Sequence, residues 1–245
     1  MRIQVINPNT SVAMTEKITA AAQAAARPGT QVHGCCPADG PVSIEGHFDE
    51  AIATLGVLEQ VRGGMAAGAQ AHIIACFGDP GLLAARELAA GPVIGIAEAG
   101  FHLASLVATR FAVITTLGRT RIIAEHLLQR YGFAGLCTDV SCLEVPVLDL
   151  EHCTPALVAQ MVEEGRRLRD TRGAGAIVLG CGGMADLRQA LTDALGIPVI
   201  EGVSAAVKLA ESLLDLGLGT SKHGDLAYPL AKPFKGRFAE WGQEA

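Results

Sequence analysis

The chain has 245 residues, of which 50% are hydrophobic, 18% are charged and only 4% are aromatic. This composition excludes a disordered chain, and a net charge of −6 without a long basic cluster disfavours a nucleic-acid partner. No stretch reaches about 18 uninterrupted apolar residues, and the first residues are typical of a strand and a turn. We therefore expect a soluble, cytoplasmic protein with no membrane partner.

The seven cysteines do not have the spacing of a disulfide framework or of a metal site. Their number is odd, and no export signal accompanies them. Cys35 and Cys36 are adjacent, and neither this pair nor Cys137 with Cys142 is joined by a second CxxC or an HxxxH. We therefore expect free thiols and no bound metal.

Short β-branched runs alternate with longer Ala/Leu-rich stretches at helical spacing, the pattern of an α/β fold. We predict eight strands, with helices in nearly every gap. A count of eight strands would suit a TIM barrel. The predicted strands are Ile3–Asn7, Gln31–Cys35, His72–Cys76, Val93–Gly95, Phe111–Thr115, Val140–Val145, Ala176–Gly180 and Val199–Glu201.

An internal repeat argues against the barrel. Three motifs recur in the same order at nearly constant offsets, which indicates duplication of one four-stranded βα unit. The offsets are 108 for residues 2–7 with 110–115, 105 for 72–78 with 177–183, and 106 for Pro92 with Pro198.

The duplication predicts two similar α/β lobes with parallel sheets, related by a pseudo-twofold axis. Open parallel sheets bind ligands at the C-terminal ends of their strands, so both lobes should face one cleft. The chain is expected to cross between lobes in the helices at 97–109 and 203–216. This places the first lobe at 1–97 plus 210–245 and the second at 98–209.

Cys76 and Cys181 occupy matching positions in the repeat, each after a short apolar strand and before small residues that indicate a helix start. A helix N-terminus would lower the pKa of each thiol. Two thiols on opposed lobes would place a base and an acid on the two faces of one carbon, which is what inversion next to a carbonyl requires. The carbanion needs donors such as backbone N–H groups rather than a metal, so we expect no cofactor. The remaining cysteines are interpreted as small packing residues.

Three motifs lie at predicted strand ends, VINPNT at 5–10, ACFGDPG at 75–81 and LGCGGM at 179–184, and a fourth, SIEGH at 43–47, lies in the loop after the second strand. Together they resemble the hydantoin racemases of the aspartate/glutamate racemase superfamily. The resemblance implies two Rossmann-like lobes, a cofactor-independent two-base mechanism through Cys76 and Cys181, and a homo-oligomer.

Within that group, the segments 43–59, 76–88 and 221–229 are most similar to the allantoin racemases of purine catabolism. The resemblance implies a small-molecule substrate whose C5 hydrogen lies between a ring carbonyl and a ring nitrogen. Allantoin is such a ring and carries a ureido group on C5.

Polar residues at the matching strand ends are expected to bind this substrate. Asn7, Thr115 and Thr116 would donate to ring carbonyls or to the enolate, whereas ordinary turn capping is their other interpretation. Asn9 is interpreted as a cap for the helix that begins near Ser11.

The loop after the second strand is expected to hold the ureido group through Ser43 or a main-chain N–H at Ile44. The alternative role of Ser43 is to cap the helix that begins near Gly46. Glu45 and His47 would form an acid/base pair, but working thiols make such a pair superfluous.

The loops around the two cysteines complete the expected site. Phe77 would form a wall, and Gly78, Gly182 and Gly183 would let backbone N–H groups approach an anion. Asp79 is interpreted as a cap of the helix that follows Pro80 and Gly81.

Other functions compete with racemisation. Neither GxGxxG nor GxxxxGK[ST] is present, which disfavours a nucleotide site. An arylmalonate decarboxylase needs only one strand-end cysteine, whereas a maleate isomerase, whose cysteine attacks an alkene, is not excluded by cysteine count. A racemase of hydantoins with amino-acid side chains and a non-catalytic binding module also remain open.

Overall fold

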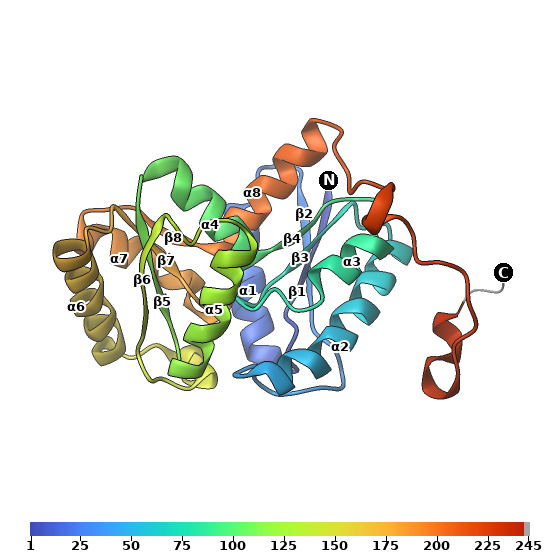
Figure 1. The fold of residues 1–245 in the computed structure, drawn as a ribbon, viewed down its shortest axis with the longest axis horizontal. Helices are drawn as coiled ribbons and strands as arrows, with labels where there is room; N and C mark the ends of the chain where they lie inside the picture. Colours follow the sequence, from blue (N-terminus) through green and yellow to red (C-terminus); the bar gives the residue numbers. More distant parts are fainter. Residues whose placement is uncertain (243–245) are drawn as a thin grey trace.

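The computed structural model describes residues 1–242 and shows two four-stranded parallel sheets, one in each of two lobes that lie side by side (Figure 1). The strand orders are the same, β2-β1-β3-β4 and β6-β5-β7-β8. The expected α/β fold of two similar lobes is confirmed, and the barrel is excluded. The strands are β1 (Arg2–Ile6), β2 (Gln31–Cys35), β3 (Ala71–Ile74), β4 (Val93–Gly95), β5 (Phe111–Thr115), β6 (Cys137–Cys142), β7 (Ala176–Leu179) and β8 (Val199–Glu201).

Helices cover both faces of each sheet, which explains why the central strands are almost continuously apolar. The α-helices are α1 (Val12–Ala25), α2 (His47–Ala66), α3 (Leu82–Leu88), α4 (Ile96–Val107), α5 (Gly118–Arg130), α6 (Pro155–Arg172), α7 (Arg188–Leu195) and α8 (Gly202–Asp215). The short 3-10 helices are η1 (Val147–His152), η2 (Gly182–Leu187), η3 (Gly224–Leu226) and η4 (Gly236–Trp241).

Hydrogen bonds between the central strands show that the two sheets share one register. The N–H of Ala75 donates to the carbonyl of Ile6 at 2.8 Å, and the N–H of Gly180 donates to the carbonyl of Ile114, also at 2.8 Å. These bonds close the pairing of β3 with β1 and of β7 with β5. The residues that follow Ala75 and Gly180 are the two cysteines, so their thiols start from equivalent points.

Helices α4 and α8 join the lobes by exchange. Helix α4 follows β4 of the first sheet but packs against β7 and β8 of the second, while α8 follows β8 and packs against β3 and β4. The two helices cross so closely that a Cβ on Gly202 would lie 2.3 Å from the carbonyl oxygen of Ile96. The crossings agree with the expected segments. We propose the lobe division 1–97 with 210–245 and 98–209, of which 243–245 lie outside the described residues.

Strand β6 begins and ends three residues earlier than the predicted Val140–Val145. The half-buried polar residues Thr138 and Asp139 already pair with β5 or the helices beside it, although their composition is not typical of a strand. The strand ends because Glu144 adopts a left-handed conformation, with φ 55°.

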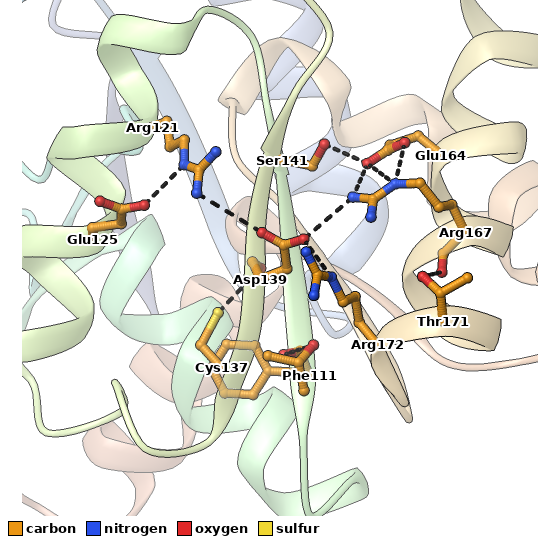
Figure 2. A network of polar contacts seen from close by, with 11 residues as sticks. Phe111, Arg121, Glu125, Cys137, Asp139, Ser141, Glu164, Arg167, Thr171 and Arg172 are labelled. Carbon is orange, nitrogen blue, oxygen red and sulfur yellow. Dashed lines mark hydrogen bonds and ion pairs between the residues drawn. The ribbon is translucent and has the colours of Figure 1, made fainter.

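Asp139 on this edge strand connects β6 to the helices beside it (Figure 2). Its carboxylate lies 3.3 Å from Nη2 of Arg167 and 3.2 Å from Nε of Arg172, both on α6, and 4.0 Å from Nη2 of Arg121 on α5. Arg167 also pairs with Glu164, whose pKa it lowers. The arginines are exposed, so the network fixes the geometry of the edge more than it adds stability.

The segment after α8 returns to the first lobe. Lys222 Nζ donates to the carbonyl of Glu87 at 3.0 Å, and the guanidinium of Arg62 lies 4.9 Å from the ring centre of Trp241.

Along residues 1–242, no helix combines the length and the apolar character needed to span a membrane.

Candidate active site

A cavity lies between the C-terminal ends of the two sheets, where loops of both lobes meet. Counted together with the solvent space at its mouth, its empty volume is about 630 Å³. The loops after β1, β3, β5 and β7 all contribute to its lining, and both Cys76 and Cys181 belong to it. The two thiols predicted to share one site therefore do so.

Cys76 lies in a tight turn that follows β3. The N–H of Asp79 donates to the carbonyl of Cys76 at 3.0 Å, and the N–H of Gly78 is directed at the thiol. The expected helix N-terminus is wrong for this thiol, because α3 begins only at Leu82 after the left-handed Gly81, with φ 70°. The local donor is a turn amide rather than a helix end.

Cys181 does lie at a helix N-terminus, since it is the N-cap residue of η2. The N–H of Met184 donates to its carbonyl at 3.1 Å, and the N–H of Gly183 is directed at its thiol. A 3-10 helix of six residues has a small dipole, so the thiol gains mainly from this one amide.

The expected lowering of the thiol pKa values is wrong. Burial raises the pKa of Cys181 to about 11, against the opposing effects of the Gly183 N–H and the Lys17 ammonium. Burial raises the pKa of Cys76 further still, and the carboxylates of Asp79 and Glu50 add to that rise. Removing the thiols from water outweighs the amides that face them.

Lys17 lies outside the cavity lining, but its positive charge acts on the Cys181 thiol. From α1 of the first lobe, its ammonium donates to the carbonyl of Leu150 at 2.6 Å and lies 3.0 Å from Asp186 in the second lobe. Only 15% of the Lys17 side chain is exposed, so this charge is screened little by water. The two thiols therefore have equivalent backbone positions but different electrostatic surroundings.

The two cysteine loops touch at glycine. A Cβ on Gly182 would lie 2.8 Å from the carbonyl oxygen of Ala75, the residue before Cys76. A Cβ on Gly183 would lie 2.9 Å from the sulfur of Met14. Glycine at position 182 therefore permits the close approach of the two cysteine loops, and glycine at position 183 permits the close packing of the Cys181 loop on Met14 of α1. Gly78, Gly182 and Gly183 all line the cavity, as expected.

Asn7, Thr115 and Thr116 form the buried floor of the cavity. The Asn7 side-chain amide donates to Oδ1 of Asn9 at 2.7 Å, and Oγ1 of Thr115 lies 3.0 Å from Oγ1 of Thr120. Their polar groups are thus already paired within the protein, and they fix the strand ends beneath the thiols. Whether they bind substrate stays a prediction.

The cap of α1 is Ser11 rather than Asn9. The Ser11 hydroxyl accepts from the N–H of Met14 at 3.1 Å, and Asn9 Oδ1 instead accepts from the N–H of Ser11 at 2.9 Å. Asn9 is buried and lines the cavity because it supports the turn that carries Asn7.

The loop 43–46 brings Ile44 into the cavity lining, whereas Ser43 is not part of it. Ser43 thus lies beside the lining rather than in it, and its binding of the ureido group stays a prediction. Alternation along the loop explains the difference, since Ile44 faces inward and Glu45 reaches the second lobe, where its Oε1 accepts from the N–H of Val147 at 2.9 Å. Ser43 does not cap α2 either, because Gly46 is the N-cap residue.

Phe77 forms a wall of the cavity as expected. It is buried and packs edge-on against Phe101 of α4, with the ring centres 5.5 Å apart. Asp79, by contrast, does not cap the helix that follows it. Its carboxylate accepts from the N–H groups of Ala97 and Glu98 at the start of α4.

Two polar groups in the lining, one on α2 and one on α5, carry no recognisable signal in the sequence. Thr120 and Glu50 both lie in the first turns of helices, where sequence patterns explain them as ordinary helix-start residues. The side chain of His47, one turn before Glu50, is 69% exposed. His47 and Glu45 therefore have different neighbours and do not form the acid/base pair that was considered.

The described residues contain no group of three or more His, Cys, Asp or Glu side chains placed to hold a metal ion. What the cavity offers is two thiols, backbone amides beside each of them, and walls that are mostly apolar. This arrangement suits proton transfer at a carbon atom whose neighbouring oxygen becomes anionic.

Comparison with known proteins agrees with this geometry. Residues 3–210 match the model of the Asp/Glu/Hydantoin racemase family. A hydantoin racemase from Pseudomonas sp. (strain NS671) is 44% identical over 99% of this chain and 98% of its own. Among solved structures, an allantoin racemase from Klebsiella pneumoniae is 60% identical, with a TM-score of 0.96 and 99% of both chains covered.

An allantoin racemase from Pseudomonas fluorescens is 38% identical, with a TM-score of 0.92, and the match covers 96% of this chain and 100% of that one. The chain therefore belongs to the Asp/Glu/Hydantoin racemase family and is a racemase, an enzyme of the isomerase class.

Proposed function

We propose that this racemase interconverts the enantiomers of a 5-substituted hydantoin, with allantoin as its substrate, by proton transfer between C5 and the thiols of Cys76 and Cys181. The observation that carries the proposal is that the two thiols follow equivalent strand ends in two lobes and line one cavity. A planar intermediate held between them could be protonated on either face.

The reaction begins with one cysteine as thiolate and the other as thiol. The thiolate removes the C5 proton, and the electron pair of the C–H bond moves into the ring as an enolate on the neighbouring carbonyl oxygen. The opposite thiol then donates its proton to the other face of C5, so that the two cysteines exchange protonation states. Backbone N–H groups at Gly78 and Gly183 would stabilise the negative charge. The cycle balances without a cofactor.

Allantoin is favoured as substrate because the structure of 60% identity is an allantoin racemase. The second candidate is a hydantoin with an amino-acid side chain on C5. It is supported by the 44% identical hydantoin racemase and by the apolar residues Ile44, Ile123 and Val147 in the cavity lining. A role in purine catabolism follows from the allantoin proposal. We also propose a homo-oligomer, which the family resemblance implies, and a cytoplasmic location.

The test is circular dichroism of single enantiomers of allantoin and of 5-methylhydantoin in deuterated buffer, followed by mass spectrometry for deuterium at C5. We expect loss of the optical signal with one deuterium gained. Cys76→Ser and Cys181→Ser should each abolish racemisation, while Cys36→Ser, which changes a thiol outside the cavity, should retain it. Full activity in either cavity variant would contradict the two-base mechanism.

A further inference from the structure

Among residues 1–242, Glu50 is the one carboxylate in the cavity lining, and the mechanism above does not use it. It lies in the first turn of α2, with 27% of its side chain exposed. Its Oε1 is 3.8 Å from the position where Gly78 would carry a Cβ, and its charge acts on the Cys76 thiol. The group is therefore on the Cys76 side of the cavity.

The Glu50 carboxylate has one polar side-chain neighbour among the described residues, the His47 imidazole. Within residues 1–242 no donor forms a hydrogen bond with it, and His47 Nδ1, at 3.8 Å from Oε2, is too distant for one. Burial raises the pKa of Glu50, and the neighbouring His47 opposes the rise. Because 27% of the side chain is exposed, water can donate to the carboxylate in the free enzyme. A ligand that covers it must supply N–H groups in place of that water or leave the acceptor unpaired.

The geometry of the reaction determines which part of a ligand can donate hydrogen bonds to the Glu50 carboxylate. In the planar enolate the three bonds of C5 share one plane, and the two sulfur atoms must lie above and below it. The ring and the C5 substituent therefore point in opposite directions within the space between the thiols. The buried end of the cavity is formed by Asn7 and Thr115, and the exposed end by Glu50 beside His47.

We propose that the Glu50 carboxyl is a specificity-determining group that accepts hydrogen bonds from N–H donors on the C5 substituent of the substrate. Ile123, whose Cγ2 lies 3.8 Å from the same Gly78 position as Glu50, is apolar and offers no hydrogen bond to distinguish an alkyl from a ureido group. Glu50 thus favours binding of a substituent with N–H donors, such as ureido. An alkyl substituent would displace water from the carboxyl without replacing its hydrogen bonds. This inference rests on the proposed function, whose substrate class it narrows.

The test compares kcat/KM for allantoin with that for 5-isopropylhydantoin in the parent protein, Glu50→Leu and Glu50→Gln. We expect Glu50→Leu to lower kcat/KM for allantoin by roughly ten- to a hundredfold, mainly through KM, and to leave the alkyl hydantoin equal or better. Glu50→Gln keeps one acceptor oxygen and should recover part of the preference. Glu59→Gln removes an equal charge from an exposed position of the same helix and should change neither value.

The outcomes separate this inference from the proposed function. An equal loss for both substrates in Glu50→Leu, or a shift of the pH profile with the preference unchanged, would assign Glu50 to folding or to thiol titration and overturn the inference alone. The preference for allantoin over 5-isopropylhydantoin is also measured as the ratio of their dissociation constants in the Cys76→Ser background, with and without Glu50→Leu. If the parent protein neither binds nor racemises either compound, both the function and the inference are wrong.

Discussion

The hydroxyl of Tyr131 donates a hydrogen bond of 2.9 Å to Oδ2 of Asp79, and this bond joins the second lobe to the loop of Cys76. The same carboxylate accepts from the N–H groups of Ala97 at 3.1 Å and Glu98 at 3.0 Å. Asp79 holds a left-handed backbone with φ 46°, which a residue other than glycine adopts only when its surroundings enforce it. One buried side chain therefore fixes the Cys76 turn, the start of α4 and the end of α5 together.

In the second lobe, a different residue caps the N-terminus of the crossing helix α8. Glu201 occupies the position equivalent to Gly95, and its own carboxylate accepts from the N–H groups of Val203 at 2.8 Å and Ser204 at 2.7 Å. In the first lobe Gly95 leaves space for Asp79, because a Cβ there would lie 2.2 Å from Cγ of Asp79. The duplicated halves thus keep a carboxylate at each crossing helix, although only one of them connects to a cysteine loop.

Tyr131→Phe should destabilise the protein by on the order of 1 kcal/mol, because the Asp79 carboxylate loses a buried donor. Burial raises the pKa of Asp79 to about 7, above the value near 4 of an unfolded chain. The folded state then holds the extra proton between about pH 4 and pH 7, so this group lowers stability as pH rises through that window. Loss of the Tyr131 bond raises the pKa further and extends the window upward.

Urea unfolding of the parent protein and Tyr131→Phe from pH 5 to pH 9 measures this effect. Tyr228→Phe, which changes a hydroxyl on the exposed segment after α8, is the matched control. Identical free energies of unfolding for parent and Tyr131→Phe at every pH would show that the bond contributes nothing.

The contact between Glu45 and Val147 should control substrate binding, because it joins the two lobes beside the cavity. Ile44 and Val147 both line the cavity, and the 2.9 Å hydrogen bond from the Val147 N–H to Glu45 holds them in place. Glu45→Ala leaves that N–H without its acceptor, and we expect KM to rise about fivefold with a smaller change in kcat. Glu45→Gln keeps an acceptor oxygen and should behave like the parent protein. Equal KM values for the alanine and glutamine variants would refute this role.

Gly182→Ala should reduce kcat/KM by about a hundredfold or more, since its Cβ would lie 2.8 Å from the backbone oxygen of Ala75. Carbonyl groups cannot move aside as flexible side chains do, so the two cysteine loops must separate. Gly63→Ala is the control, because a Cβ at this exposed position of α2 meets nothing within 4 Å. It should keep full activity and gain stability of about 0.5 to 1 kcal/mol, measured by urea unfolding. A fully active Gly182→Ala protein would show that the contact between the loops is dispensable.

The fold could be predicted from sequence because its signals are periodic and repeated. The motifs of the first half recur in the second half at a nearly constant spacing. This spacing identifies the matching strands and the equivalent positions of Cys76 and Cys181. Buried parallel strands are apolar on both faces, so their positions are visible in a single sequence. The polar edge strand β6 lacks this apolar signal, and its predicted bounds therefore differ from the observed ones.

The parts of the site that sequence could not predict depend on contacts between distant segments. Asp79 caps α4 rather than α3 because the chain turns back on itself, and Glu50 reaches the cavity from a helix whose start looks ordinary. The expectation that the thiol pKa values are lowered is wrong because it too ignores contacts between distant segments. Strand-end glycines indicate nearby amides, but the depth at which the opposite lobe buries each sulfur is a tertiary property.

The raised thiol pKa values predict that catalysis accelerates with pH. The two-base mechanism needs one thiolate, and with the pKa of Cys181 at about 11 and that of Cys76 higher, the thiolate fraction rises about tenfold per unit between pH 7 and pH 10. We expect kcat/KM, corrected for the uncatalysed rate, to rise over this range. Alkylation of Cys181 by iodoacetamide in the Cys76→Ser protein should follow the same slope. Lys17→Met removes the ammonium that lowers the pKa of Cys181 and should slow alkylation at any one pH, whereas Lys235→Met on the exposed tail should not. A rate that stays flat or falls above pH 7 would mean that a thiolate already exists in the resting enzyme.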